Sequence, residues 1–375
     1  MDDGARETGG LDRARDPAPR RRRRWGRRPP YRPPDQQAAD ADRPRSSATY
    51  AALDLGTNNC RLLVARPTGD GFRVVDAFSR IIRLGEGMSA SGRLSDAAIA
   101  RAVDALSVCR DKMKNRAVTR ARLIATEACR SAVNGENFRT RIASEVGLEL
   151  EIVDRETEAT LAASGCTPLL DPRAKGAMLF DIGGGSSELV RLGPSRSSRR
   201  GPPLPDILGW ISVPIGVVTL AERHGGVAVT RESYESMVSE VAGFITRFAD
   251  DYHLRGLDEV HLLGTSGTVT TIAGVHLGLK RYDRRYIDGC WMSDAQISTV
   301  IEQLLAMSYE ERVANACIGA ERADLVLAGC AILEAIRRAF PCERVRVADR
   351  GLREGMLVQM MRADGVWGRV EDSAT

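Results

Sequence analysis

Long apolar runs are absent from the sequence, and this absence first narrows the class of protein. No uninterrupted apolar run is long enough to cross a bilayer, and no apolar stretch follows the basic N-terminal region as in a signal peptide. We therefore expect no transmembrane segment and a cytoplasmic location. The eight cysteines are scattered, with no C-x-x-C motif and no histidine at ligand spacing. A zinc site and a disulfide framework are thus not expected.

Lysine is also scarce, because only four of the 54 basic residues are lysines and the others are arginines. The planar guanidinium of arginine suits bidentate binding of phosphate. The chain has 375 residues, of which 43% are hydrophobic and 28% charged. This composition is typical of a soluble globular protein with two domains or three small ones.

The excess of positive charge lies in the first 50 residues, which contain 13 Arg against 8 Asp and Glu. Arginines at 20–24, 27 and 28 are interleaved with proline and single aromatic residues, a composition that disfavours a packed core. We expect residues 1–48 to be a disordered tail. Such a run can hold a polyanion, whereas composition alone favours a solvated extension without a specific role. No specific nucleic-acid binding is expected of the folded part.

The ordered part contains a repeat of domain size. Residues 50–55 and 60–65 are expected to be two strands joined by the turn 56–59, and the same plan recurs at 177–192. The motif Leu53-Asp54-Leu55-Gly56 aligns with Phe180-Asp181-Ile182-Gly183 at a constant offset of 127 residues. The pattern predicts an α/β fold with related domains at 49–174 and 175–368. Helices are expected at 320–339 and 352–362, and the last one could pack back on the first domain.

An aspartate at a strand end before a glycine turn places a carboxylate beside outward-pointing backbone N–H groups. Such a turn can bind an anion, and the carboxylate can bind a divalent cation. A single copy could equally be an ordinary hairpin turn, but two copies in register favour one shared cleft. Asp54 and Asp181 are then expected to lie close together.

Other phosphate-binding motifs are excluded by their context. The Gly183-Gly184-Gly185 turn does not open a helix as a dinucleotide fingerprint does, and no G-x-x-x-x-G-K-[ST] motif occurs. The turn at 264–268 precedes an expected helix, whose N-terminus could attract a phosphate. Taken alone, this last signal is weak.

The motifs DLGTNN (54–59), TEACR (126–130), DIGGGSSELV (181–190), GTSGT (264–268) and DRGLREG (349–355) occur in this order. Together they resemble the exopolyphosphatase and guanosine-pentaphosphate phosphohydrolase family, over about residues 50–362. The resemblance implies two ribonuclease H-like domains of the actin-like ATPase fold around a cleft, and it is to the short two-domain members.

The resemblance also implies roles for individual residues. It assigns binding of Mg²⁺ or Mn²⁺, or of the attacking water, to Asp54, Asp181 and Glu188. Arg130 is expected to contact phosphate oxygens, and Arg353 and Glu354 to brace the closing loop. The phosphate-binding residues are expected to be Gly56, Thr57, Asn58, Asn59, Gly183, Gly184, Gly185, Ser186, Ser266, Gly267 and Thr268.

The sequence departs from the family pattern where the catalytic base is expected. Members often read Ser-Gly-x-Glu-Glu-Ala-Arg-Leu, whereas this chain reads Asp-Arg-Glu-Thr-Glu-Ala-Thr-Leu at 154–161. Glu158 matches the catalytic glutamate and is the expected general base. Glu156 is a rival, and both could instead be solvated helix carboxylates.

The expected function is hydrolysis of the terminal phosphoanhydride of inorganic polyphosphate to orthophosphate, by in-line attack of water with metal assistance. The nearest alternative is the same reaction on the 5′ end of pppGpp, since the motifs touch only phosphate. The chain could also be an ATP-dependent small-molecule kinase, or a non-catalytic sensor of an alarmone or polyphosphate. A homodimer is the default expectation for the assembly.

Overall fold

The computed structural model describes residues 48–195, 201–251 and 259–368. The predicted tail, residues 1–48, lies almost entirely outside the described residues, so its disorder stays a prediction. The bounds of the first half follow the chain in order: β1 (Tyr50–Leu55), β2 (Asn59–Pro67), β3 (Phe72–Ile81), α2 (Met88–Ser91), α3 (Asp96–Asn115), β4 (Arg120–Ala125), α4 (Glu127–Ser131), α5 (Gly135–Val146), β5 (Glu151–Ile152), α6 (Arg155–Cys166) and the short 3₁₀ helix η1 (Thr167–Leu169).

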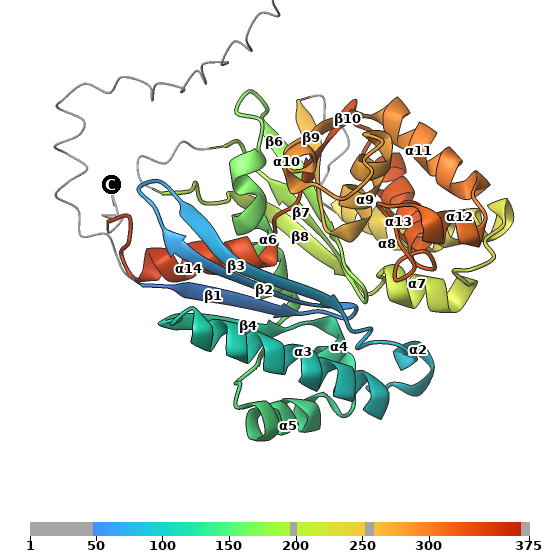
Figure 1. Cartoon of the computed structure of the whole chain (residues 1–375). Helices are drawn as coiled ribbons and strands as arrows, with labels where there is room; N and C mark the ends of the chain where they lie inside the picture. Colours follow the sequence, from blue (N-terminus) through green and yellow to red (C-terminus); the bar gives the residue numbers. More distant parts are fainter. Residues whose placement is uncertain (1–47, 196–200, 252–258, 369–375) are drawn as a thin grey trace, which may run out of the picture. The chain divides into compact units, whose positions relative to one another are not determined.

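The second half contains a larger sheet and more helices (Figure 1). Its elements are β6 (Gly176–Ile182), β7 (Ser187–Leu192), β8 (Ile207–Val213), α7 (Val217–His224), α8 (Arg231–Asp251), β9 (Val260–Thr265), α9 (Gly267–His276), α10 (Arg284–Ile287), β10 (Trp291–Ser293), α11 (Asp294–Ala306), α12 (Tyr309–Ala314), α13 (Val326–Ala339), β11 (Arg344–Ala348) and α14 (Leu352–Ala363).

The two sheets share one strand order. The first is β3-β2-β1-β4-β5, and the second is β8-β7-β6-β9-β11 with β10 added at the edge. In both, the first three strands are antiparallel and the next two are parallel, while the added β10 is antiparallel to β11. The repeat predicted from the offset of 127 residues is therefore a repeat of sheet topology.

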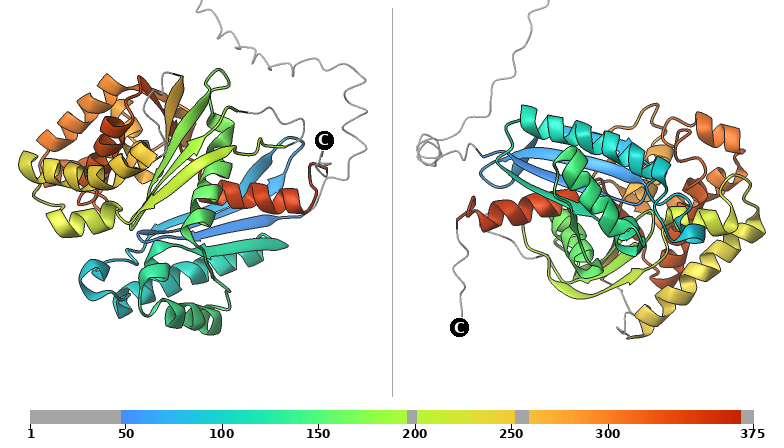
Figure 2. Two further views of the ribbon diagram at one scale, coloured as in Figure 1. Left: turned by 180° about the vertical axis from the view of Figure 1, so that it is seen from behind. Right: turned by 90° about the horizontal axis from the view of Figure 1, so that it is seen from below.

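Helices α6 and α14 fill the space between the two sheets, as the views of Figure 2 show. Their apolar residues form one core with strand residues of both sheets, among them Tyr50 and Leu63 of the first and Leu179 and Val190 of the second. A separate core lies on the outer side of each sheet. Helix α6 follows β5 and α14 follows β11, and these strands run parallel to β1 and β6, which carry the glycine turns. Both helices therefore begin at the sheet edges where the turns lie, and the central core also fixes the position of the site.

The helix predicted at 320–339 begins later, at Val326. The residues before it form turns, and Asp324 accepts two hydrogen bonds from Arg83, at 2.8 and 3.0 Å. This ion pair joins the segment after β3 to the second half of the chain, a long-range contact that helical periodicity does not reveal. The apolar pattern of 320–325 thus reflects burial in a turn.

Local capping explains where two important helices start. The side chain of Ser95 accepts a hydrogen bond from the Ala98 N–H at 3.2 Å and caps α3. The carboxylate of Asp154 accepts one from the Thr157 N–H at 2.7 Å and caps α6. Glu158 therefore lies in the first turn of a helix whose start is fixed by its own sequence.

Two absences concern the described residues. None of the helices described combines the length and apolar character that a bilayer crossing requires. All eight cysteines lie in the described part of the chain and are free thiols, as predicted. Six of them are buried.

Candidate active site

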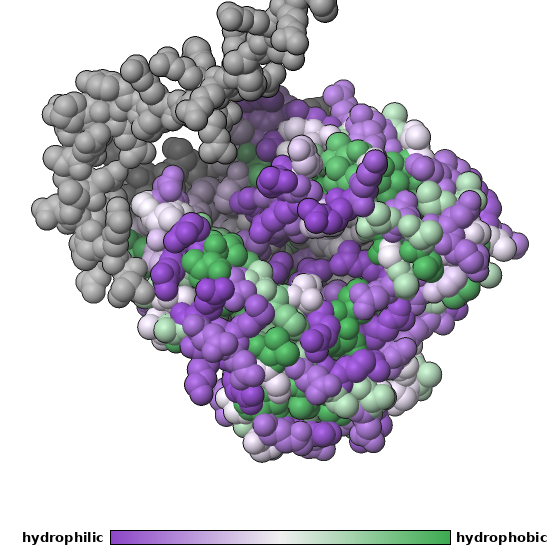
Figure 3. All heavy atoms as spheres, in the orientation of Figure 1, coloured by the Kyte–Doolittle hydropathy of each residue, from purple (hydrophilic) through white to green (hydrophobic). Residues whose placement is uncertain are grey.

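The glycine turns of both hairpins line one cavity of about 880 Å³ between the two halves of the fold. Figure 3 shows the hollow in the surface, with hydrophilic residues around it. Asp54 and Asp181 both line this cavity, as predicted. It also receives the predicted residues of both turns, of the 264–268 turn, and the carboxylates of Glu158 and Glu188.

The two turns have the same geometry and touch each other. The Gly56 N–H donates to the Asn59 carbonyl at 2.9 Å, and the Gly183 N–H donates to the Ser186 carbonyl at 2.9 Å. A Cβ atom added at Gly184 would lie 2.9 Å from Thr57 Cβ and 3.2 Å from the Asn58 nitrogen. Glycine is required there because the turns approach so closely.

The third predicted loop follows β9, which pairs in parallel with β6, and it also lines the cavity. Ser266, directly before α9, has φ +88° and ψ −176°, a backbone conformation that residues other than glycine rarely adopt. Among the residues that the structure describes, its Oγ atom is buried without a hydrogen-bond partner, as are the Oδ1 atoms of Asn58 and Asn59. Orphaned polar atoms on a cavity wall indicate a place for a polar ligand.

Burial disfavours the charge of the carboxylates at the cavity floor. Burial and then the charge of Asp54 raise the pKa of Asp181 to about 6. Burial and then the charge of Asp181 raise the pKa of Glu188 to about 7. Burial, followed by the charge of Glu188, raises the pKa of Glu158 well above its ordinary value. The cavity floor therefore favours protons or a cation.

The structure separates the two candidate bases. Glu158 is buried, with 7% of its surface exposed, and lines the cavity. Glu156 is exposed and does not line it. Of the two, only Glu158 faces the space where a substrate would lie.

Arg130 differs from its expected position. It does not line the cavity, and its guanidinium donates to Glu158 at 3.2 Å, to the Val153 carbonyl at 2.6 Å and to Glu127. The two terminal nitrogens of Arg130 thus already donate to protein groups. This arrangement does not favour direct contact of Arg130 with phosphate.

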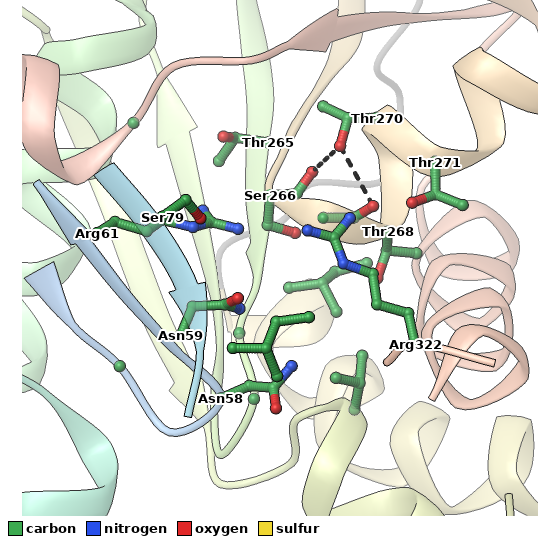
Figure 4. Close-up of a pocket in the computed structure, with 18 of the residues that line it drawn as sticks. Asn58, Asn59, Arg61, Ser79, Thr265, Ser266, Thr268, Thr270, Thr271 and Arg322 are labelled. Atoms are coloured by element: carbon green, nitrogen blue, oxygen red, sulfur yellow. Dashed lines mark hydrogen bonds between the residues drawn. The ribbon is translucent and has the colours of Figure 1, made fainter. Parts of the chain in front are cut away.

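Sequence reasoning missed three arginines that do line the cavity: Arg61, Arg322 and Arg353. None has an ion pair or side-chain hydrogen bond within the described part of the chain. Figure 4 shows Arg61 and Arg322 reaching into the cavity from opposite sides. Arg353 was expected to brace a loop, whereas its neighbour Glu354 does so by accepting from the Gly351 N–H at 3.0 Å. The signal for Arg61 was its place opposite Asp54 in the hairpin.

The carboxylates of the cavity are candidate ligands for a divalent ion. Hard oxygen donors gathered in one cavity suit Mg²⁺ or Mn²⁺. Across the described ranges, however, no three His, Cys, Asp or Glu side chains lie close enough together to hold an ion by themselves. The residues present fit an ion held by one or two carboxylates together with phosphate oxygens and water, which is the usual Mg²⁺ arrangement.

Two sheets of this order around a cleft lined by twin phosphate-type turns define an actin-like ATPase fold with two ribonuclease H-like domains. The model of the Ppx/GppA phosphatase family matches residues 63–364, and the chain belongs to this family. The predicted fold and family are thereby confirmed.

Individual relatives are distant in sequence and differ in length. A Mycobacterium tuberculosis protein named exopolyphosphatase 2 is 28% identical over 83% of this chain and 98% of its own length. A Photobacterium profundum protein named guanosine-5′-triphosphate,3′-diphosphate pyrophosphatase is 26% identical over 84% of this chain, which spans 60% of that relative. The crystal structure of an Aquifex aeolicus Ppx/GppA family member has 27% identity and a TM-score of 0.69, covering 84% of this chain and 98% of that one.

Proposed function

We propose that the chain hydrolyses the terminal phosphoanhydride bond of inorganic polyphosphate and releases orthophosphate. The observation that carries the proposal is that both aspartate hairpins and the buried Glu158 face one cavity. Phosphoryl transfer needs chiefly positioning and neutralisation of charge, which this arrangement can supply.

In this proposal each group of cavity residues has its own role in the reaction. The N–H groups of the two turns bind the oxygens of the terminal phosphate, together with the hydroxyl-rich turn at Ser266. The free guanidinium groups of Arg61, Arg322 and Arg353 bind phosphates further along the substrate. Glu158 accepts the proton of the attacking water, and burial together with the charge of Glu188 raises its pKa, which makes the carboxylate a stronger base. Arg130 orients Glu158.

One or two of the carboxylates of Asp54, Asp181 and Glu188, together with phosphate oxygens and water, would hold Mg²⁺ or Mn²⁺, which would supply positive charge to the phosphate oxygens and the leaving group. The mutual effect of these carboxylates on their pKa values supports this assignment, since a cation relieves the repulsion.

The same reaction on the 5′ end of pppGpp is the second candidate, because the groups above contact only phosphate. The match over 98% of a relative named exopolyphosphatase favours polyphosphate, since the pyrophosphatase relative is matched over 60% of its length. Phosphate release without ATP consumption would separate both from a kinase, and tight binding without turnover would indicate a sensor.

The deciding experiment measures phosphate release from polyphosphate of defined length and from pppGpp, with and without divalent cation. We expect cation-dependent release, faster from polyphosphate. Glu158→Gln should lower turnover by about 10²- to 10⁴-fold, the usual contribution of a general base. Glu156→Gln is the matched control on the same helix and should retain turnover. Full activity of Glu158→Gln with an unchanged fold would reject the assignment.

The location, the assembly and the domain boundary of the protein stay predictions. We infer a cytoplasmic protein, a homodimer, and a domain boundary near 174–175. We also infer that the basic tail binds polyanions.

A further inference from the structure

Four side chains of alternating charge form a series of contacts that ends at Glu158, and the two carboxylates among them, Glu127 and Glu158, line the cavity. Arg155 donates to the carboxylate of Glu127 at 3.2 and 3.4 Å, and the Ser131 hydroxyl donates to it at 2.6 Å. Glu127 accepts from Arg130, whose two terminal nitrogens lie 3.2 and 3.3 Å from one oxygen of Glu158. The order is therefore Arg155, Glu127, Arg130, Glu158.

The charges of these four side chains must balance because three of the four are largely buried. The side chains of Glu127 and Glu158 are 10% exposed and that of Arg130 is 19% exposed, whereas Arg155 is 41% exposed. Without Arg155, two buried carboxylates would share one guanidinium. Arg155 brings the set to neutrality from the solvent side.

Glu127 also supports the second glycine turn. A Cβ atom added at Gly185 would lie 3.0 Å from Glu127 Cγ, so the side chain packs directly against that turn. Although burial opposes it, hydrogen bonds from Ser131, Arg155 and Arg130 hold the pKa of Glu127 below its ordinary value. Glu127 thus remains a charged anchor between the turn and Arg130.

We propose that Arg155 and Glu127 are positioning residues for Glu158, acting through Arg130. This inference rests on the proposed function of Glu158 as the base. Arg155 and Ser131 satisfy much of the hydrogen-bonding capacity of Glu127, which leaves Arg130 free to donate to Glu158. If Arg155 is removed, Arg130 is drawn toward Glu127, and the Glu158 carboxylate loses its fixed orientation. Arg155 stands where the family pattern has glycine, so this contact distinguishes the chain from that pattern.

The test compares the kinetics of Arg155→Ala, Glu127→Gln and the double variant on whichever substrate the wild type hydrolyses. For Arg155→Ala we expect kcat to fall about three- to fivefold with unchanged KM and unfolding temperature, because a half-exposed ion pair contributes modestly. Glu127→Gln should lower kcat by about tenfold or more, and adding Arg155→Ala should lower it no further. Arg155→Lys should recover part of the loss.

Arg141→Ala is the matched control, since Arg141 pairs with Glu145 at similar exposure, 43%, away from the cavity. It should match the wild type. Full kcat in Arg155→Ala, or additive losses in the double variant, would overturn the proposal. A loss of kcat that parallels a lower unfolding temperature would also overturn it, because the role would then be structural.

A second readout needs no turnover and so separates this inference from the proposed function. Hindered rotation of a guanidinium held between two carboxylates gives resolved side-chain N–H signals in NMR, and Arg130→Lys identifies those of Arg130. We expect these signals in the wild type and in Arg141→Ala, and broadening in Arg155→Ala. Unchanged Arg130 signals in Arg155→Ala would contradict the proposal even if the enzyme proved to have a different substrate.

Discussion

The hairpins β1–β2 and β6–β7 have the same backbone plan and different charge. Asp54 lies opposite Arg61 in the first, whereas Asp181 lies opposite Glu188 in the second, at the corresponding register position. The first hairpin is thus balanced and presents a guanidinium to the cavity, while the second concentrates two carboxylates. Under the proposed function, one duplicated structure would bind phosphate on one side and a cation on the other.

Removing one charge from the second hairpin, β6–β7, which we call the acidic hairpin, should have the largest effect on turnover. We expect Glu188→Gln to lower turnover by about 100-fold or more, because a neutral amide oxygen binds a divalent cation more weakly than a charged carboxylate. Ser212 donates to Glu188 at 2.8 Å, so the amide oxygen keeps that contact and the fold should persist. The measurement is turnover against Mg²⁺ concentration. If Glu188→Gln requires no more Mg²⁺ than the wild type, the acidic hairpin does not hold the ion.

Removing the guanidinium of Arg61 from the first hairpin, β1–β2, should affect substrate binding more than the chemical step. Arg61→Gln should raise KM about tenfold, since one charge-assisted contact to phosphate is lost, with a smaller change in kcat. Steady-state kinetics on long and short polyphosphate would show this. A response like that of Glu188→Gln, mainly in cation dependence, would mean that the two hairpins do not differ in role.

The contact between the hairpins is the target of Gly184→Ala. The added methyl group would meet the side chain of Thr57 and the backbone of Asn58, so the turns must move apart. We expect a loss of about 1–3 kcal/mol in the free energy of unfolding and several-fold lower turnover. Denaturant unfolding and activity assays on one preparation check both. Gly69→Ala is a suitable control, because no atom lies within 4 Å of the added Cβ.

The smallest expected effect is on pH-dependent stability. The pKa values of Asp181 and Glu188, about 6 and about 7, exceed their ordinary values of 3.8 and 4.5. Their stabilising contribution is therefore complete below about pH 4 and is lost as the pH rises through 6 and 7. Without divalent cation the unfolding temperature should fall over this range, and Mg²⁺ should raise it more at pH 8 than at pH 5. Equal effects of Mg²⁺ at both pH values would contradict this.

The sequence predicted the parts of the fold that depend on short-range pattern. Strand–turn–strand units and the repeat of the aspartate motif are local signals, and their elements appear where expected. The start of α13 was misplaced because the Arg83–Asp324 ion pair joins residues 241 positions apart. Strand β8 was missed, since no turn signal of the kind that marks β1–β2 precedes it.

The site shows the same division. Motif positions placed every predicted residue except Arg130 on the cavity wall. The free arginines and the contacts of Arg155 with Glu127 depend on which side chains tertiary packing leaves unpaired or brings together. The spacing of residues along the sequence does not show which side chains tertiary packing will pair.

The most direct test of the shared cavity is a crystal structure with a non-hydrolysable imido analogue of triphosphate and Mn²⁺, located by its anomalous signal. The account predicts a terminal phosphate bound by N–H groups of both glycine turns, with Mn²⁺ beside Asp181 or Glu188. Phosphate bound by one turn alone, or Mn²⁺ away from these carboxylates, would contradict it.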